Sequence, residues 1–244
     1  MKTKLSFLIL LSSFYCFSQD TDEPVTIRFS LPSTADRLQD DRTRIFTIKG
    51  TPYLNEEHQL GTIINGETTM EAPIRYNAYY DYFQVLDENK KKASVLKSNN
   101  VIVQLDGKTY HLLTYEETVQ DKALYYLPQN KNQQLSGNMK EGYFCALSDG
   151  ETVLYNKTTK RVPKFKLQDH GYTQFAPTDL VTLNHYYIKR KHRPAVRIKL
   201  SKKEVLFALN NKYNEVRDYI KKNKLKVKTE EEVIQILSYY DTLD

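Results

Sequence analysis

The side chains that could carry out acid–base or metal chemistry are scattered along the chain and match no known catalytic spacing. The sequence has no HExxH motif and no His/Cys pair at zinc spacing. It also lacks GxSxG, P-loop and GxGxxG motifs. Neighbouring acids such as Glu56 and Glu57 would point to opposite faces of a strand, which does not suit a general acid/base pair. We therefore expect no catalytic residue, no cofactor and no metal, and we interpret the protein as not an enzyme.

A tyrosine-rich run, residues 72–86, contains the first candidate binding site. Strand alternation would place Arg75, Asn77 and Tyr79 on one face. This face could hold a small ligand or a glycan above an aromatic floor. Alternatively, Asp81 marks a bend that divides the run into two strands, which a salt bridge and a side chain–backbone bond would lock. The second interpretation is favoured, because strands commonly place such groups at bends.

The second candidate site is a cluster of four basic residues where a hairpin turn is expected, namely Lys189, Arg190, Lys191 and Arg193. Such a cluster could contact anionic lipid headgroups, lipopolysaccharide or nucleic acid. The alternative is a solvated turn without a partner. Nucleic acid is the weaker expectation, because residues 1–18 have the pattern of a secretory signal peptide and an exported protein rarely meets nucleic acid.

The positive charge of the chain is concentrated near the C-terminal end. The formal net charge is +6. Residues 189–228 contain 15 Lys/Arg and 3 Asp/Glu, whereas residues 229–244 contain 5 acids and no Lys/Arg. The remaining chain is close to neutral, so attraction to an anionic partner is expected to act through residues 189–228.

Most of the elements that position these residues are expected to be short β-strands within residues 42–200. Runs rich in Val, Ile, Thr, Tyr and Phe alternate with turn sequences such as Asn65-Gly66 and Asp106-Gly107. We predict an α+β, mainly β protein whose strands form an antiparallel β-sandwich or a partly open barrel. Residues 156–179 are basic and irregular, and we expect them to form a long loop.

Three short helices are predicted in residues 201–244, where the hydrophobic period changes. Ser201-Lys-Lys-Glu204 and Thr229-Glu-Glu-Glu232 both have the pattern of a capping box, in which the side chains bond to free backbone N–H groups. Apolar residues follow each box at helical spacing. We expect these helices to pack on the sheet or on each other.

The N-terminal residues 1–18 have the pattern of a secretory signal peptide. Two early lysines precede an apolar stretch, Leu5 to Phe17, which is too short to span a bilayer. Cleavage before Gln19 would leave residues 19–41 as a flexible mature N-terminus and no transmembrane helix. Cys145 would then be the only cysteine, which excludes an internal disulfide. We expect an exported protein that is periplasmic, associated with the outer membrane or extracellular.

Several sequence blocks in a fixed order resemble a family of uncharacterised, signal-peptide-bearing exported proteins of flavobacteria and other Bacteroidota. The blocks are Gly-Thr-Pro-Tyr-Leu-Asn at 50–55, Ile-Arg-Tyr-Asn-x-Tyr at 74–79, Tyr-Tyr-Ile at 186–188, Arg-Ile-Lys-Leu-Ser-Lys-Lys-Glu-Val-Leu at 197–206 and Tyr-Ile-Lys-Lys-Asn-Lys-Leu-Lys at 219–226. The family has no established activity, so the resemblance supplies no catalytic residues. It implies a location in the envelope of a Gram-negative cell.

These observations predict a non-catalytic protein of the cell envelope that binds or supports another component. The expected partner is an envelope protein or an anionic membrane surface. Two alternatives remain open: a small-ligand or glycan-binding module that uses the tyrosine-lined face, and a hydrolase whose site has no recognisable sequence pattern.

Overall fold

The computed structural model describes residues 26–30, 43–116, 125–126, 139–163 and 179–243. The predicted signal peptide and residues 164–178 of the predicted loop lie outside these ranges. Of the predicted mature N-terminus, the structure describes residues 26–30, which form a strand.

The strands, in chain order, are β1 (Thr26–Ser30), β2 (Thr43–Thr47), β3 (Gln59–Asn65), β4 (Thr68–Asn77), β5 (Tyr82–Leu86), β6 (Lys92–Ser94), β7 (Val101–Leu105), β8 (Lys108–Glu116), β9 (Tyr125–Tyr126), β10 (Met139–Ala146), β11 (Thr152–Pro163), β12 (Val181–Arg190) and β13 (Val196–Ile198). The helices are α3 (Lys202–Ala208), the 3₁₀ turn η1 (Asn210–Lys212), α4 (Tyr213–Lys222) and α5 (Glu230–Tyr240).

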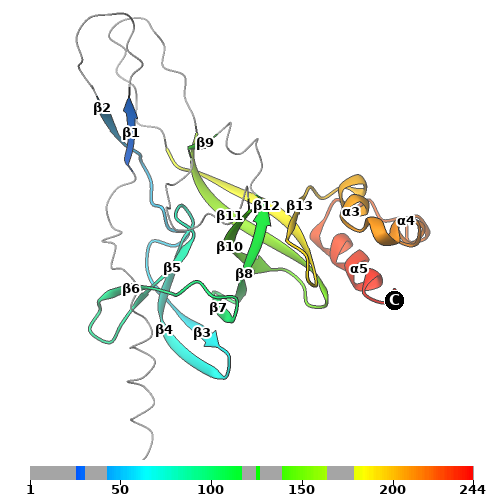
Figure 1. Cartoon of the computed structure of the whole chain (residues 1–244), viewed down its shortest axis with the longest axis horizontal. Coiled ribbons are helices and arrows are strands. Elements are labelled where there is room, and N and C mark those ends of the chain that lie inside the picture. The colour runs from blue at the N-terminus through cyan, green and yellow to red at the C-terminus, as the bar shows by residue number, and fades with distance from the viewer. Residues whose placement is uncertain (1–25, 31–42, 117–124, 127–138, 164–178, 244) are drawn as a thin grey trace, which may run out of the picture.

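A single antiparallel sheet contains most of the described strands, in the order β13-β12-β11-β10-β8-β7-β3-β4-β5-β6, with β9 paired to β11. Most neighbours in this sheet are consecutive in the sequence, but β7 returns to pair with β3. β1 and β2 form a separate antiparallel pair, which extends away from the sheet in Figure 1. The predicted mainly β class with three C-terminal helices is confirmed. The single open sheet is closer to the predicted partly open barrel than to a sandwich.

The hairpin turns lie where the sequence predicts them. Asp106 and Gly107, between β7 and β8, have φ angles of 53° and 67°. Positive φ at both central residues is what a type I′ turn requires, and Asp and Gly adopt it more readily than most residues. The turn between β3 and β4 begins at Gly66, which has a φ angle of 59°.

The first hydrophobic core lies on one face of strands β3, β4, β5, β7, β8 and β10. Ile74, Phe83 and Val103 have no exposed surface there. The Phe83 ring meets the rings of Tyr76, Tyr110 and Tyr143 at centroid distances of 4.8, 5.1 and 4.8 Å. The contacts with Tyr110 and Tyr143 are edge-to-face, and such contacts add to the free energy gained from burial.

The other half of the sheet curls so that the residue before β13 reaches β8. The Ala195 N–H donates a hydrogen bond to the Thr114 carbonyl at 2.9 Å, although β10, β11 and β12 separate these segments in the sheet. A second, mostly aromatic cluster packs in this region. Its buried members are Leu113, Tyr115, Phe144, Tyr155, Tyr187 and Ala195.

The three helices cover β11, β12 and β13 at one end of the sheet (Figure 1). Leu154 and Ile188 of the sheet share a buried cluster with Leu209, Val216 and Ile236 of the helical segment. Burying one such side chain contributes about 1.5–3 kcal/mol. The predicted docking of the helices on the sheet is therefore confirmed, and the helical tail shares a core with the β-strands.

Side-chain caps begin two of these helices as the sequence predicts. The Ser201 hydroxyl accepts the Glu204 N–H, and the Thr229 hydroxyl accepts the Glu232 N–H. The Glu232 carboxylate also accepts the N–H groups of Lys226 and Lys228 at 2.9 and 2.8 Å. Between those two N–H groups lies Val227, which has a φ angle of 58°. Positive φ is unfavourable for a β-branched residue, so Glu232 holds a strained turn in place.

Glu232→Ala is expected to lower the melting temperature, because it removes both acceptors that hold the strained turn. The N–H groups of Lys228 and Lys226 keep the pKa of Glu232 below its ordinary value. The stabilisation is therefore present at neutral pH and is lost as the pH falls through the lowered pKa. Thermal melts at pH 7 and pH 4 measure this effect, with Glu215→Ala on exposed α4 surface as the control. Equal melting temperatures for the two variants at pH 7 would contradict the assignment.

The prediction of a long loop over residues 156–179 is wrong for residues 156–163. These residues continue β11 to Pro163 and pair with β12, from Thr152↔Arg190 to Arg161↔Val181. The sequence obscures this strand because polar residues occupy its buried positions. Lys157 and Thr159 are 2% and 5% exposed. The usual alternation of apolar and polar residues is therefore missing.

Candidate functional site

Arg75, the first residue of the candidate ligand face, makes its contacts with other residues of the protein. Its guanidinium carbon lies 3.6 Å from the centroid of the Tyr53 ring. Its Nε donates to Gln84 Oε1 at 2.8 Å, and its Nη1 donates to the Glu56 carbonyl at 2.8 Å. Arg75 and Gln84 are cross-strand partners in β4 and β5. The side chain therefore ties the β4–β5 hairpin to the segment before β3.

Asn77 and Tyr79 belong to the turn between β4 and β5. Asn77 is fully buried, and its Oδ1 accepts the N–H groups of Tyr79 and Tyr80 at 3.2 and 2.9 Å. The turn ends at Asp81, which has a φ angle of 61°. This side chain–backbone bonding at a bend is the structural interpretation that the sequence favoured.

The tyrosine-lined face does not form an open groove. Tyr79 is 4% exposed and Phe83 is fully buried. An uninterrupted strand would place Phe83 on the same face as Asn77, but the turn shifts the alternation and Phe83 packs against Tyr76 in the first core. A glycan or small ligand would have no ring surface to stack on at this face.

Arg75→Lys is expected to lower the free energy of unfolding by about 1–3 kcal/mol, although the charge is kept. An ammonium group cannot stack flat on Tyr53 while it bonds to both Gln84 and the Glu56 carbonyl. Equilibrium urea unfolding measures the change. Arg217→Lys, on the exposed surface of α4, is the matched control and should change stability little. A difference of less than about 0.5 kcal/mol between the two variants would show that the Arg75 contacts contribute little.

A buried charged cluster forms around Asp81, whose carboxylate contacts both β10 and β11. Asp81 Oδ2 lies 3.0 Å from Lys157 Nζ and 3.7 Å from Lys97 Nζ. Asp81 Oδ1 accepts the Tyr143 N–H at 3.1 Å and the Tyr76 hydroxyl. Lys157 Nζ also donates to the Tyr143 carbonyl at 3.1 Å. The cluster thus joins the β4–β5 turn to two strands far away in the sequence.

The protonation states of the cluster follow from its contacts. Burial alone would raise the pKa of Asp81. The ammonium groups of Lys157 and Lys97 and the Tyr76 hydrogen bond outweigh burial, and they hold the pKa of this carboxyl well below its ordinary value. Burial lowers the pKa of Lys157 to about 8 against the attraction of Asp81. At neutral pH Asp81 and Lys157 therefore form an ion pair, and their hydrogen bonds are made to each other and to neighbouring protein groups.

The β4–β5 turn fills the place where β10 and β11 separate. These strands pair only at Cys145↔Asn156 and Ala146↔Tyr155. Beyond that point the Lys160 N–H of β11 donates to the Ala78 carbonyl at 2.9 Å. On the other strand, Asp81 accepts an N–H of β10. The turn therefore supplies hydrogen-bond acceptors that each strand would otherwise find in its neighbour.

Sequence reasoning missed this cluster, although one signal pointed to it. A glycine inside a strand pattern often marks a close approach of another group. A Cβ on Gly142 would lie 2.4 Å from both Asp81 Oδ2 and Lys157 Nζ. Nothing in the sequence near Lys157 indicates that it pairs with Asp81.

The predicted basic cluster spans the end of β12, with Lys189 and Arg190, and the turn before β13, with Lys191 and Arg193, and only part of it faces solvent. Lys191 and Arg193 are exposed, and Lys191 lies 2.7 Å from Glu151 of the β10–β11 turn. Arg190 donates to Asn211 of η1 at 2.6 Å. Lys189 is half-buried and donates to the Arg190 carbonyl. The cluster thus joins the sheet to the layer formed by the C-terminal helices, which we call the helical layer. Lys191 and Arg193 are its two exposed cations at the turn.

A different surface combines cations with exposed rings. Phe207 on α3 is 72% exposed and Tyr213 at the start of α4 is 45% exposed. With the exposed Lys202 and Lys203 they line a shallow hollow of about 720 Å³. We call Lys199, Lys202, Lys203, Phe207 and Tyr213 the α3 surface. Helical spacing places 203 and 207 one turn apart, which explains why a lysine and a phenylalanine are neighbours.

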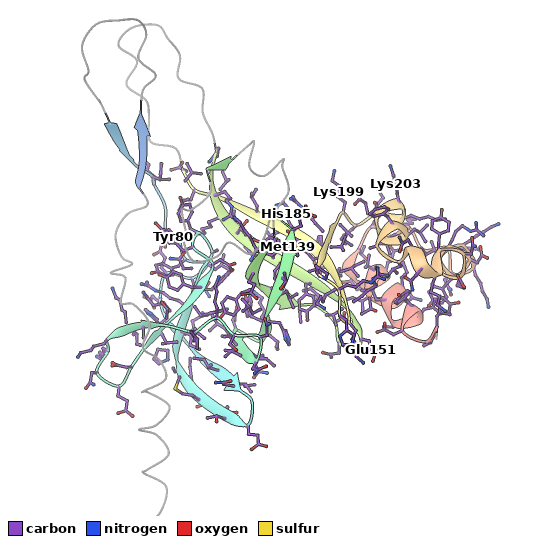
Figure 2. All side chains as sticks on the ribbon, viewed as in Figure 1. Tyr80, Met139, Glu151, His185, Lys199 and Lys203 are labelled. Atoms are coloured by element: carbon purple, nitrogen blue, oxygen red, sulfur yellow. The ribbon has the colours of Figure 1, made fainter. Side chains whose placement is uncertain are left out.

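A second hollow of about 510 Å³ adjoins the first, because Glu204 lines both. It lies between the β12–β13 hairpin and α3 and is lined largely by polar residues, including His185, Arg197 and Lys199. One Arg197 Nη lies 2.9 Å from His185 Nδ1. Figure 2 shows Lys199 and Lys203 extending toward the same side of the molecule. The sequence did not single out these residues, because their proximity depends on how α3 docks on β13.

In the described part of the chain, no group of three or more His, Cys, Asp or Glu side chains could hold a metal ion. None of the described helices has both the length and the apolar character that a membrane crossing needs.

Comparison with known proteins gives no relative. No family model, no curated protein and no solved structure matches the chain.

Proposed function

We propose that this chain is an exported, non-catalytic protein of the cell envelope, periplasmic or associated with the outer membrane, and that it binds another envelope component through its helical layer. The observation that carries the proposal is the exposure of Phe207 and Tyr213 among lysines on the α3 surface. Exposed apolar side chains that gather on one surface and are rimmed by polar groups can mark a contact site.

The buried charged residues favour a binding role over a catalytic one. The most strongly perturbed charged groups, Asp81 and Lys157, are buried and engaged with one another and with backbone groups. Perturbed pKa values can mark catalysis, but structural ion pairs produce them too. Neither hollow on the helical layer contains these groups. The distribution of exposed and buried groups therefore favours contact over turnover.

Site-specific photo-cross-linking in cells that export the protein tests this proposal. A photoreactive phenylalanine analogue would replace Phe207. The matched control would replace Leu60, which is 71% exposed on β3. We expect the Phe207 position to give one defined adduct with an envelope component, lipid or protein, and the Leu60 position to give none. If the protein fractionates as a free monomer and Phe207 gives no defined adduct, the proposal is wrong.

A further inference from the structure

We propose that the α3 surface binds a lipid bilayer that carries anionic headgroups. This inference rests on the proposed function and names its partner. The α3 surface has three exposed lysines, and among the described residues that line its hollow Glu204 is the one acid. Lysines near an anionic bilayer gain free energy from the negative surface potential, and the effect is short-ranged. Cations grouped on one surface therefore favour an anionic partner.

The rings of the α3 surface suit the boundary between headgroups and acyl chains. Phe207 can insert its apolar ring at this depth, and Tyr213 has an apolar ring with a polar tip. The lysine stems can lie along the apolar region while their ammonium groups reach the phosphates. The arrangement is that of a protein lying on a membrane, and it requires no membrane-spanning helix.

An acidic protein partner fits the same surface less well. The centre of a protein–protein interface is depleted in charged residues, and lysine is among the residues found there least often. On the α3 surface, Lys203 and Phe207 are one helical turn apart, so the apolar and charged groups are not separated into a core and a rim. The apolar part consists chiefly of two rings, whereas a stable protein interface buries about 800 Å² on each partner.

Vesicle binding tests the inference with the full chain. Sedimentation would compare vesicles of phosphatidylcholine alone with vesicles that also contain phosphatidylglycerol. All variants share the same N-terminal segment, so differences between them report the α3 surface. We expect binding to the anionic vesicles that exceeds binding to the neutral ones and weakens at high salt.

The variants distinguish binding through the α3 surface from binding through the overall positive charge of the chain. Lys202→Gln with Lys203→Gln is expected to weaken binding about 20- to 30-fold, because each lysine contributes about fivefold. Lys221→Gln with Lys222→Gln removes the same charge from the far end of α4 and should change binding less than about threefold. Phe207→Ser is expected to weaken binding about tenfold. Circular dichroism confirms that each variant is folded.

Three results of the vesicle experiments would overturn the inference. They are equal binding to neutral and anionic vesicles, equal losses for the two lysine pairs, and unchanged binding of Phe207→Ser. A defined protein adduct at Phe207 without vesicle binding would also overturn it, but would leave the proposed function intact. A lack of any adduct in cells, together with fractionation as a free monomer, would instead contradict the proposed function itself.

Discussion

Lys157→Met is expected to lower the free energy of unfolding by about 3–5 kcal/mol. Methionine retains much of the apolar stem but leaves the buried Asp81 carboxylate without its closest cation. Asp81 is 8% exposed, so water cannot replace the lost ammonium group. Equilibrium urea unfolding at pH 7 measures the loss from the shift of the midpoint.

Two further variants establish that the loss comes from the uncompensated charge. Lys108→Met removes a lysine from an exposed pair with Asp106 at 3.9 Å, and it should change stability by less than about 1 kcal/mol. Asp81→Asn combined with Lys157→Met removes both charges of the 3.0 Å pair but leaves the Lys97 ammonium group, so it should recover part of the loss. Asparagine also tolerates the positive φ angle of position 81. If Lys157→Met and Lys108→Met are equally mild, the ion pair does not stabilise the fold.

The ion pair also predicts the direction of the acid response. The unfolded chain binds a proton at Asp81 near the ordinary pKa of about 3.9, whereas the folded chain binds it only at lower pH. The stabilisation is therefore complete above about pH 4 and is lost as the pH falls below that value. Asp81→Asn should flatten this part of the stability profile.

Gly142→Ala is expected to have the second large effect, a loss of about 3–5 kcal/mol. The added methyl group would lie 2.4 Å from both partners of the ion pair and would force them apart. Urea unfolding again measures the loss. Gly107→Ala is the informative control because nothing lies within 4 Å of its Cβ, so only the positive φ angle opposes it. That control should cost about 1–2 kcal/mol.

A double-mutant cycle connects these two predictions. When Lys157→Met is already present, the ammonium group no longer crowds position 142. Gly142→Ala should then cost less than it does in the natural sequence. Strictly additive losses would mean that the glycine is needed for another reason.

Local sequence signals predicted the elements of the fold well. Asp106-Gly107 has the two positive φ angles of its turn, and Ser201 and Thr229 cap their helices. These features depend on residues within a few positions of each other. Residues 156–163 were missed because Lys157 and Thr159 are polar yet buried, and their burial depends on distant partners.

The candidate sites were harder to predict for the same reason. Asp81 and Lys157 are 76 residues apart, so no spacing rule connects them. Arg75 and Asn77 stood out by residue type, but type alone cannot separate a ligand contact from a buried structural bond. The α3 surface depends on which side of one short helix packs on β13. The sequence shows the positive charge of its lysines, but it does not predict that Phe207 is exposed.

The strand order has a consequence for how copies of this protein meet each other. The two strands that end the long sheet, β6 and β13, contain three residues each. A sheet edge recruits another chain through its row of free N–H and C=O groups, and a short edge offers few of them. β13 also leads directly into α3, which packs against it. These two terminal strands therefore offer few free N–H and C=O groups for edge-to-edge association between copies of the folded protein.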